Sequence, residues 1–188
     1  MKSQLLITSS KYQFERALEL IDDQAAASDS AYRRAVPLLR QAAAAHHPRA
    51  LFHLGVAYDL GLGVQQDWRK AARLFRSAMQ RGHQDAKFNF AICCLEGTGV
   101  RKSVSRAFWL LNEEAANGHS YSLGKLGDFY RIGEYVEINL KHAASLYRIA
   151  ARRGDSFAAE RLAMMHATGQ GFRKLYCPRL LGIGSVRG

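Results

Sequence analysis

The seven histidines are the side chains of this sequence best suited to bind a metal ion or to transfer protons. None has the His-Glu-x-x-His spacing that places two imidazole rings on one helix face around zinc. His46 and His47 are neighbours, whereas His83 and His119 lie 36 residues apart and each directly follows a glycine. This regular placement favours a structural position in a turn, so we expect neither a metal site nor histidine-based catalysis.

The three cysteines and a pair of adjacent acids are the next candidates for chemistry. Cys93 and Cys94 are neighbours and Cys177 stands alone, a spacing that fits neither a zinc site nor a set of disulfides. We expect Cys94 to be a buried, inert thiol and Cys93 to be exposed, and reactive only if its pKa is lowered. Glu113 and Glu114 are expected to be surface residues rather than a catalytic dyad.

Three Gly-x-Gly sequences invite comparison with a dinucleotide-binding loop. They begin at Gly61, Gly97 and Gly169. A dinucleotide-binding loop follows a β-strand, whereas each of these glycines follows a segment with the apolar spacing of a helix. We therefore interpret the three sequences as helix-ending turns, and we expect a chain that has no cofactor and is not an enzyme.

The same glycines belong to an internal repeat of 36 residues. Gly61, Gly97, Gly133 and Gly169 keep this period. Further columns at the same step contain Gly82, Gly118 and Gly154; Ala71, Ala107 and Ala143; and Leu74, Leu110 and Leu146. A fixed period of this length is typical of solenoid proteins, in which each unit packs against its neighbours.

Each repeat contains two predicted helices. The first, called helix A, is expected at residues 50–60 of the first full repeat, because apolar residues recur there at helical spacing before a glycine. The second, called helix B, is expected to follow Asp67, Ser103 or Asn139, whose side-chain oxygens can cap free helical N–H groups. Each helix A also has one small residue that would let a neighbouring helix approach: Gly55, Ala91, Gly127 or Ala163.

The N-terminal end departs from this pattern. Ser10 and Gln13 have the spacing of a capping box, which predicts a helix from Ser10 to about Gln24 that covers one end of the array. An earlier helix B is expected at residues 31–45, with Pro37 kinking it or lying in its first turn.

These elements define the expected organisation of a chain of 188 residues with 48% apolar composition. We predict an all-α fold, a right-handed superhelical solenoid of antiparallel helix pairs. The expected units are an N-terminal helix pair (1–49), three repeats (50–85, 86–121 and 122–157), a partial repeat (158–172) and a poorly ordered basic tail (173–188).

The first full repeat has a recognisable pattern. It consists of Ala-x-x-x-Leu-Gly-x-x-Tyr-x-x-Gly-x-Gly-Val at residues 50–64, then Asp67, Lys70-Ala71 and Ala78 up to Gly82. This unit resembles the Sel-like repeat (suppressor/enhancer-of-lin type), a relative of the tetratricopeptide repeat, and the resemblance extends over about residues 31–172. Cys94 and His166 depart from it by replacing the tyrosine, and Tyr135 replaces a turn glycine. The resemblance implies an α-solenoid that scaffolds protein complexes, with helix A on the concave surface and helix B on the convex one.

The helix A positions that face away from the core predict a groove that is apolar and aromatic with scattered charges. Aromatic residues, methionine and arginine are enriched in the cores of protein interfaces, so this groove is expected to bind a helix or an extended peptide. The predicted groove residues are Arg49, Phe52, Val56, Leu60, Asp85, Phe88, Ile92, Glu96, Tyr121, Asp128, Ile132, Phe157 and Met164. The alternative for Phe52, Phe88 and Phe157 is that they pack between adjacent repeats.

Basic residues recur in the helix B columns and predict stripes of positive charge on the convex side. These residues are Arg33, Arg34, Arg40, Arg69, Lys70, Arg76, Arg106, Lys141 and Arg148. Such stripes are usually a solvated face that keeps a protein soluble, and the alternative is an adaptor for nucleic acid or an anionic surface. We consider nucleic acid the weaker alternative because no nucleic-acid-binding motif accompanies the charge.

The formal net charge of +11 favours an acidic partner. No segment has the length and hydropathy of a signal sequence or a membrane span, so we expect a cytoplasmic protein. Its expected partner is another protein, contributing a peptide, a helix or a single domain. A bacterial immunity protein that neutralises a cognate toxin or effector is the sharper form of this hypothesis, and the oligomeric state is left open.

Overall fold

The computed structural model describes residues 2–22 and 29–171, and every regular element in these ranges is an α-helix. In chain order they are α1 (Lys2–Asp22), α2 (Asp29–Ala44), α3 (Pro48–Leu60), α4 (Trp68–Met79), α5 (Gln84–Glu96), α6 (Val104–Ala116), α7 (Ser120–Ile132), α8 (Leu140–Arg152) and α9 (Ser156–Thr168). Helices α3, α5, α7 and α9 are the predicted A helices, and α2, α4, α6 and α8 are the B helices. The predicted tail at 173–188 lies outside the described residues.

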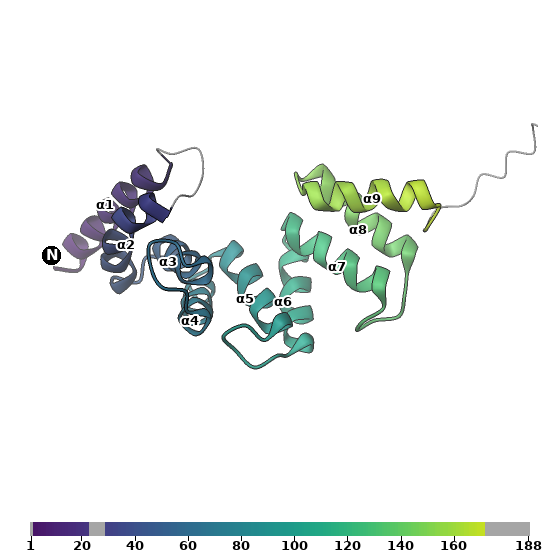
Figure 1. The fold of residues 1–188 in the computed structure, drawn as a ribbon, viewed down its shortest axis with the longest axis horizontal. Helices are drawn as coiled ribbons and strands as arrows, with labels where there is room; N and C mark the ends of the chain where they lie inside the picture. Colours follow the sequence, from purple (N-terminus) through teal and green to yellow (C-terminus); the bar gives the residue numbers. More distant parts are fainter. Residues whose placement is uncertain (1, 23–28, 172–188) are drawn as a thin grey trace, which may run out of the picture.

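The helices form a linear array rather than a globular bundle. They follow one another along the long axis in chain order, with α1 and α9 at opposite ends (Figure 1). Each helix packs mainly against the helices before and after it, and α7 also contacts α9. The core accordingly consists of two clusters, one around Leu39 and Leu54 and the other around Phe75, Leu111 and Tyr147. The predicted all-α solenoid is confirmed.

Glycines end the A helices as the repeat pattern predicts. Gly61, Gly97 and Gly133 have φ values of 73°, 83° and 76° and donate their N–H groups to the carbonyl oxygens of Ala57, Cys93 and Phe129. This left-handed conformation satisfies a free helical carbonyl and is readily adopted by glycine. His46 occupies the column of Gly82, Gly118 and Gly154 and has a φ of 63° without being a glycine.

The second glycine of each Gly-x-Gly lies against the backbone of the preceding B helix. A Cβ atom at Gly63 would collide with the backbone of Tyr32 and Arg33, and one at Gly99 with the carbonyl of Trp68. Tyr135 holds the same column in the third full repeat and does not have a positive φ. Tyr135 is 48% exposed, and its hydroxyl lies 3.5 Å from that of Ser105 on α6.

Where an A helix crosses a B helix, the sizes of the two side chains in contact are complementary. A Cβ atom at Gly55 would lie 2.7 Å from the Phe75 ring, and one at Gly127 would lie 2.6 Å from the Tyr147 ring. The middle repeat has Ala91 and Leu111 at the corresponding positions, a larger residue on helix A and a smaller one on helix B. Each glycine therefore makes room for an aromatic ring.

The helix N-termini confirm two of the three predicted caps. The carboxylate of Asp67 accepts a hydrogen bond from the N–H of Lys70 at 2.9 Å, and the Asn139 side chain accepts one from His142 at 2.9 Å. Ser103 is in the N-cap position of α6 but forms no side-chain capping bond.

The predicted capping box at the N-terminal end is wrong. Helix α1 begins at Lys2, so Ser10 lies within the helix, where it is buried. The Ser-x-x-Gln spacing caps a helix only where the helical backbone starts, and here it continues upstream. Pro37 lies in the interior of α2, which begins at Asp29, so its placement in the first turn is also wrong.

Candidate functional site

The predicted groove residues lie on the four A helices, α3, α5, α7 and α9. Eight of them are exposed: Arg49, Leu60, Asp85, Glu96, Tyr121, Ile132, Phe157 and Met164. Five are half-buried: Phe52, Val56, Phe88, Ile92 and Asp128. The A helices thus present large apolar side chains to solvent, with Phe157 at 73% and Leu60 at 62% exposure.

A column of histidines connects successive A helices. The Nδ1 atoms of His47, His83 and His119 each accept the backbone N–H three residues later, at 3.3 Å. These rings cap α3, α5 and α7, and Asp155 takes the same role for α9, accepting from Ala158 at 3.0 Å. Nδ1 can accept only when unprotonated. Burial lowers the pKa of His47 and of His83, which favours this neutral form.

Two of these histidines, His83 and His119, contact the rings of two predicted groove residues. Phe52 stacks on His83 with ring centroids 4.5 Å apart, and Phe88 lies 5.4 Å from His119. Both rings therefore pack between repeats, as the alternative interpretation anticipated. Phe157 is exposed and is the groove aromatic most available to a partner.

A cavity of about 240 Å³ lies where α5, α7 and α9 meet. Its apolar rim consists of Phe88, Tyr121 and Phe157. The polar side chains that line it are Lys125, Asp128, Tyr147, Asp155 and Arg161. The structure therefore brings together four predicted groove residues from three A helices: Phe88, Tyr121, Asp128 and Phe157. Sequence reasoning missed Lys125 and Arg161, which lie in none of the predicted columns.

A hydrogen-bond network fixes the floor of this cavity. The hydroxyl of Tyr147 donates to Asp128 at 2.7 Å and accepts from the Nε of Arg131 at 3.2 Å. Arg161 Nε lies 3.7 Å from the Asp128 carboxylate. Burial, followed by the hydrogen bond to Asp128, raises the pKa of Tyr147, so this phenol stays protonated and donating. The carboxylate of Asp128 is thus a positioned acceptor at the base of the groove.

Two expectations about individual residues in the middle repeat are wrong. Cys93 is buried, and burial raises the pKa of its thiol to about 11, so it is not a reactive surface thiol. Glu114 is also buried, at 2% exposure, and pairs with Lys87 of α5 at 3.0 Å. Glu113 does lie at the surface and binds the same ammonium group at 2.7 Å. Helix periodicity places Glu114 in a buried column, a signal that the adjacent acids obscured.

The predicted basic residues all lie exposed on B helices. Some have partners: Arg33 pairs with Asp29 at 2.7 Å, and Lys70 with Asp67 at 3.1 Å. Arg76 and Arg106 instead line a second cavity, of about 460 Å³, together with three cations outside the predicted columns: Arg73, Arg101 and Lys102. The adjacent Arg101 and Lys102 were the available sequence signal for this cluster.

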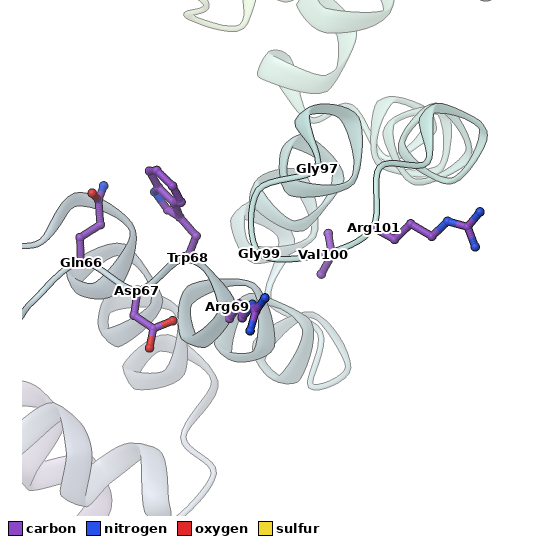
Figure 2. A pocket seen from close by; sticks show the side chains of 8 residues that line it. All are labelled: Gln66, Asp67, Trp68, Arg69, Gly97, Gly99, Val100 and Arg101. Carbon is purple, nitrogen blue, oxygen red and sulfur yellow. The ribbon is translucent and has the colours of Figure 1, made fainter.

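A third hollow, of about 640 Å³, lies where the loop before α4 meets the loop before α6. Its lining residues are Gln66, Asp67, Trp68, Arg69, Gly97, Gly99, Val100 and Arg101. Figure 2 shows that these side chains fan out in different directions, with Arg101 directed away from Trp68. Because the polar groups do not converge on one point, this hollow offers no centre for chemistry.

In the described part of the chain, no group of three or more histidine, cysteine, aspartate or glutamate side chains could hold a metal ion. Of the helices at 2–22 and 29–168, none is both long enough and apolar enough to cross a membrane.

Solved structures similar to this chain include Sel1 repeat proteins. A Sel1 repeat protein from Oxalobacter formigenes is 26% identical with a TM-score of 0.76, covering 88% of this chain and 67% of its own. The protective antigen c5321 of uropathogenic Escherichia coli is 29% identical with a TM-score of 0.72, and this chain covers 34% of its length. The immunity protein Pa5087 from Pseudomonas aeruginosa is 16% identical with a TM-score of 0.48, covering 80% of this chain and 68% of its own.

Among curated proteins, none matches this chain. A family model described as Sel1 repeat matches residues 48–83, 84–119, 120–155 and 156–174. Proteins built from this repeat are generally protein-interaction modules and generally not enzymes. Because the four matches together cover more than half of its residues, the chain belongs to the Sel1 repeat family.

Proposed function

We propose that this protein binds a partner protein in the groove of α3, α5, α7 and α9, with the cavity between α5, α7 and α9 as the centre of recognition. The observation that carries the proposal is the pair of exposed aromatic rings, Tyr121 at 48% and Phe157 at 73%, beside a cavity with a fixed carboxylate, Asp128. Exposed aromatic anchors around a recess with oriented polar groups are typical of the centre of a protein interface.

The size of the cavity favours a side chain of a partner over a small-molecule cofactor. At about 240 Å³ it is below the range of about 300–1,000 Å³ usual for ligand pockets. A helix or an extended peptide laid along the groove can insert one apolar side chain between Tyr121 and Phe157. Lys125 and Arg161 would bind carboxylates next to that side chain, and Asp128 would accept a hydrogen bond from a neighbouring N–H or O–H group of the partner.

For the partner we propose a chemical class, an acidic protein. The net charge of +11 favours an acidic protein. A toxin or effector that this chain neutralises, as an immunity protein does, is one such partner. We retain a cytoplasmic location as part of the same proposal.

The test compares exposed aromatic residues on the two kinds of helix. After a partner is identified by affinity purification and mass spectrometry, its affinity is measured by calorimetry for Phe157→Ser and for Trp109→Ser. Trp109 lies on the B helix α6 and is 63% exposed, so it matches Phe157 in exposure but not in location. We expect Phe157→Ser to weaken binding by more than about tenfold, the effect of an interface anchor, and Trp109→Ser to leave it unchanged.

The alternative adaptor function has a separate prediction. An adaptor for nucleic acid or an anionic surface would lose binding when Arg69, Arg76 and Arg106 are changed to glutamate. It would keep its affinity with Phe157→Ser. That pair of results would overturn the groove proposal in favour of the convex basic columns.

A further inference from the structure

Two cavities of similar size occupy equivalent places in adjacent repeats. The first, called the α2–α4 cavity, has a volume of about 440 Å³ and is lined by residues of α2, α3, α4 and the loop before α4. The second, called the α4–α6 cavity, is the cavity of about 460 Å³ that Arg76 and Arg106 line. Most columns of the repeat that line the first also line the second. The α2–α4 cavity therefore serves as an internal reference for the α4–α6 cavity.

The charged side chains of the α2–α4 cavity have partners within the chain. The carboxylate of Asp67 accepts a hydrogen bond from the N–H of Lys70 at 2.9 Å and pairs with the Lys70 ammonium group at 3.1 Å. The Arg40 guanidinium donates to the hydroxyl of Tyr58 at 3.0 Å. Both cations that line this cavity are thus already satisfied without a ligand.

The α4–α6 cavity has more cations and no acid. Arg76 and Arg106 keep the columns of Arg40 and Lys70. Three uncharged residues of the preceding repeat, Pro37, Gln65 and Gln66, are replaced by Arg73, Arg101 and Lys102. Across the described residues, none of these five cations has an acid within ion-pair distance. Because clustered like charges repel one another, an anion bound among them would relieve that repulsion.

The acid of the α2–α4 cavity has no counterpart in the α4–α6 cavity. Ser103 stands in the column of Asp67, lines the cavity and makes no side-chain capping bond. The first turn of α6 therefore lacks the carboxylate that α4 has at the same place. A bound anion could accept hydrogen bonds from these N–H groups and pair with Arg106, as Asp67 does with Lys70. The Arg106 guanidinium is held beside this turn by the buried Phe90 ring, whose centroid lies 5.2 Å away.

The amount of charge favours a phosphate ester over a carboxylate. Relative to the α2–α4 cavity, the α4–α6 cavity has lost one negative charge and gained three positive charges. A carboxylate restores one negative charge, whereas a phosphate monoester carries about 1.5–2 at pH 7 and offers three acceptor oxygens. Four of the five cations are arginines, whose planar guanidinium groups bind phosphate through paired hydrogen bonds. Because the cations surround one cavity, they fit a compact anion better than an extended nucleic-acid backbone.

We propose that the α4–α6 cavity binds a phosphate monoester. Its oxygens take the place of the Asp67 carboxylate, accepting from the first turn of α6 and pairing with Arg106, while the other four cations surround them. The phosphate is carried by a small molecule or by a phosphorylated side chain of a partner, two sources that share this chemistry. The site has no lining residue in common with the groove cavity at α5, α7 and α9, so it does not depend on the function proposed above.

The test follows binding of three probes to the full chain by nuclear magnetic resonance titration at constant ionic strength. The probes are inorganic phosphate, a blocked Gly-Gly-phosphoserine-Gly-Gly peptide and the same peptide with glutamate in place of phosphoserine. We expect the phosphopeptide to bind with a Kd of about 1 mM or lower, and the glutamate peptide to bind at least about tenfold more weakly. A phosphopeptide at least about tenfold tighter than inorganic phosphate assigns the site to a modified side chain, and similar affinities assign it to a small molecule.

Two variants introduce the residues of the α2–α4 cavity into the α4–α6 cavity. Arg101→Gln with Lys102→Gln restores the two glutamines and is expected to weaken phosphopeptide binding by at least about tenfold. Ser103→Asp restores the capping carboxylate and is expected to weaken binding by a similar factor. Because this carboxylate would also cap α6, the melting temperature of Ser103→Asp should rise, so its loss of binding cannot be attributed to unfolding.

The matched control is Lys141→Gln with Arg148→Gln. Both residues are exposed on α8, outside the cavity, and the variant loses the same two charges. We expect it to change phosphopeptide affinity by less than about threefold, because solvent and salt screen distant charges. A Kd above about 1 mM, equal affinity for the phosphoserine and glutamate peptides, undiminished binding by Ser103→Asp, or equal losses in the two double variants would overturn the proposal. Tighter binding of the thymidine trinucleotide TpTpT, which has the same net charge as the phosphopeptide, would also overturn it by assigning the cations to nucleic acid.

Discussion

The stability contribution of the ion pair between Lys87 of α5 and Glu114 of α6 can be predicted by comparison with the equivalent residues of the adjacent repeats. Glu114 is 2% exposed, and one of its carboxylate oxygens has no hydrogen-bond partner in the described structure. The equivalent positions hold Leu51 with Ala78 in the preceding repeat, and Leu123 with Ala150 in the following one, all buried. Leucine and alanine thus fill these two positions in the repeats before and after the repeat that has lysine and glutamate.

Changing one partner of the pair should be costly. Lys87→Leu leaves the buried Glu114 carboxylate without its cation, a change that costs about 3–5 kcal/mol of unfolding free energy. In a chain of this size that loss corresponds to a melting temperature lower by about 6–20 °C. Glu114→Ala should cost less, about 1–3 kcal/mol, because Lys87 keeps its contact with Glu113 at 2.7 Å.

Changing both partners should restore stability. Lys87→Leu with Glu114→Ala reproduces the pairs of the adjacent repeats, and replacing a buried ion pair by apolar residues is often neutral or stabilising by about 1–4 kcal/mol. The double variant is therefore expected to be at least as stable as the parent to within about 1 kcal/mol, with a coupling energy above about 2 kcal/mol. Urea denaturation followed by far-ultraviolet circular dichroism measures all four proteins.

A surface ion pair supplies the control. Lys11→Leu breaks the pair with Glu15, in which both side chains are more than half exposed, and should change stability by less than about 0.5 kcal/mol. If the two single losses at Lys87 and Glu114 simply add in the double variant, the pair is not coupled and the reasoning from the adjacent repeats is refuted.

The same pair predicts a dependence on alkaline pH. Burial opposes the charge on Lys87, but hydrogen bonds to Glu113 and Glu114 more than offset it and raise the pKa of the ammonium group. A raised pKa in the folded state stabilises the protein fully below the unfolded-state value and less as the pH rises through the folded-state value. The loss of stability above about pH 10.4 should therefore be smaller in the double variant than in the parent.

Three shorter predictions concern packing, thiol reactivity and acid pH. Gly55→Ala should destabilise the protein by about 1–2 kcal/mol in thermal melts because its Cβ collides with the Phe75 ring, and Phe75→Leu should recover most of this loss; full stability of Gly55→Ala alone would contradict the size matching. Burial raises the pKa of Cys93 to about 11. In a Cys177→Ser variant, Cys93 should therefore react with a disulfide reagent at pH 8 at least about tenfold more slowly in the folded protein than in urea. Equal rates in the two conditions would show that the Cys93 thiol is accessible. Burial lowers the pKa of His83, so its stabilising contribution is complete above about pH 6.5 and is lost as the pH falls through the folded-state value; His83→Asp, the residue type that caps α9, should reduce the loss of stability on acidification, and an unchanged pH profile would refute this role.

The helical architecture could be predicted because the same local signals recur in every repeat. Gly61, Gly97 and Gly133 end their helices by local backbone geometry, and the repetition at 36 residues separates this signal from chance. The capping-box spacing at Ser10 occurs only once, so no repetition in the sequence supports the helix start that it predicts. Its capping pattern is genuine as a sequence, but only the conformation of the preceding residues decides whether a helix begins there, and α1 begins at Lys2.

The burial of side chains could be predicted only where the periodicity was followed strictly. Glu114 was judged together with its neighbour Glu113, although adjacent residues of a helix point in different directions. Cys93 was expected to be exposed because Cys94 was expected to be buried, although Ala57 and Phe129, one period away, are both buried. Glu114 lies one period from Ala78 and Ala150, both fully buried. A charged residue in such a column requires a partner across the interface, and Lys87 stands in the leucine column that faces it.

Departures from the repeat are where an individual function can be encoded, because the conserved columns serve packing that all repeats share. Cys94 replaces the tyrosine of the adjacent repeats, and Arg73, Arg101 and Lys102 add charge around the cavity beside it, none of which a solenoid needs in order to fold. The cavity depends on side chains from α4, α5, the following loop and α6, so its volume and unpaired charge follow from the three-dimensional arrangement rather than from spacing. Because α5 and α6 carry Lys87 and Glu114, the middle repeat also has a buried ion pair where its neighbours have leucine and alanine.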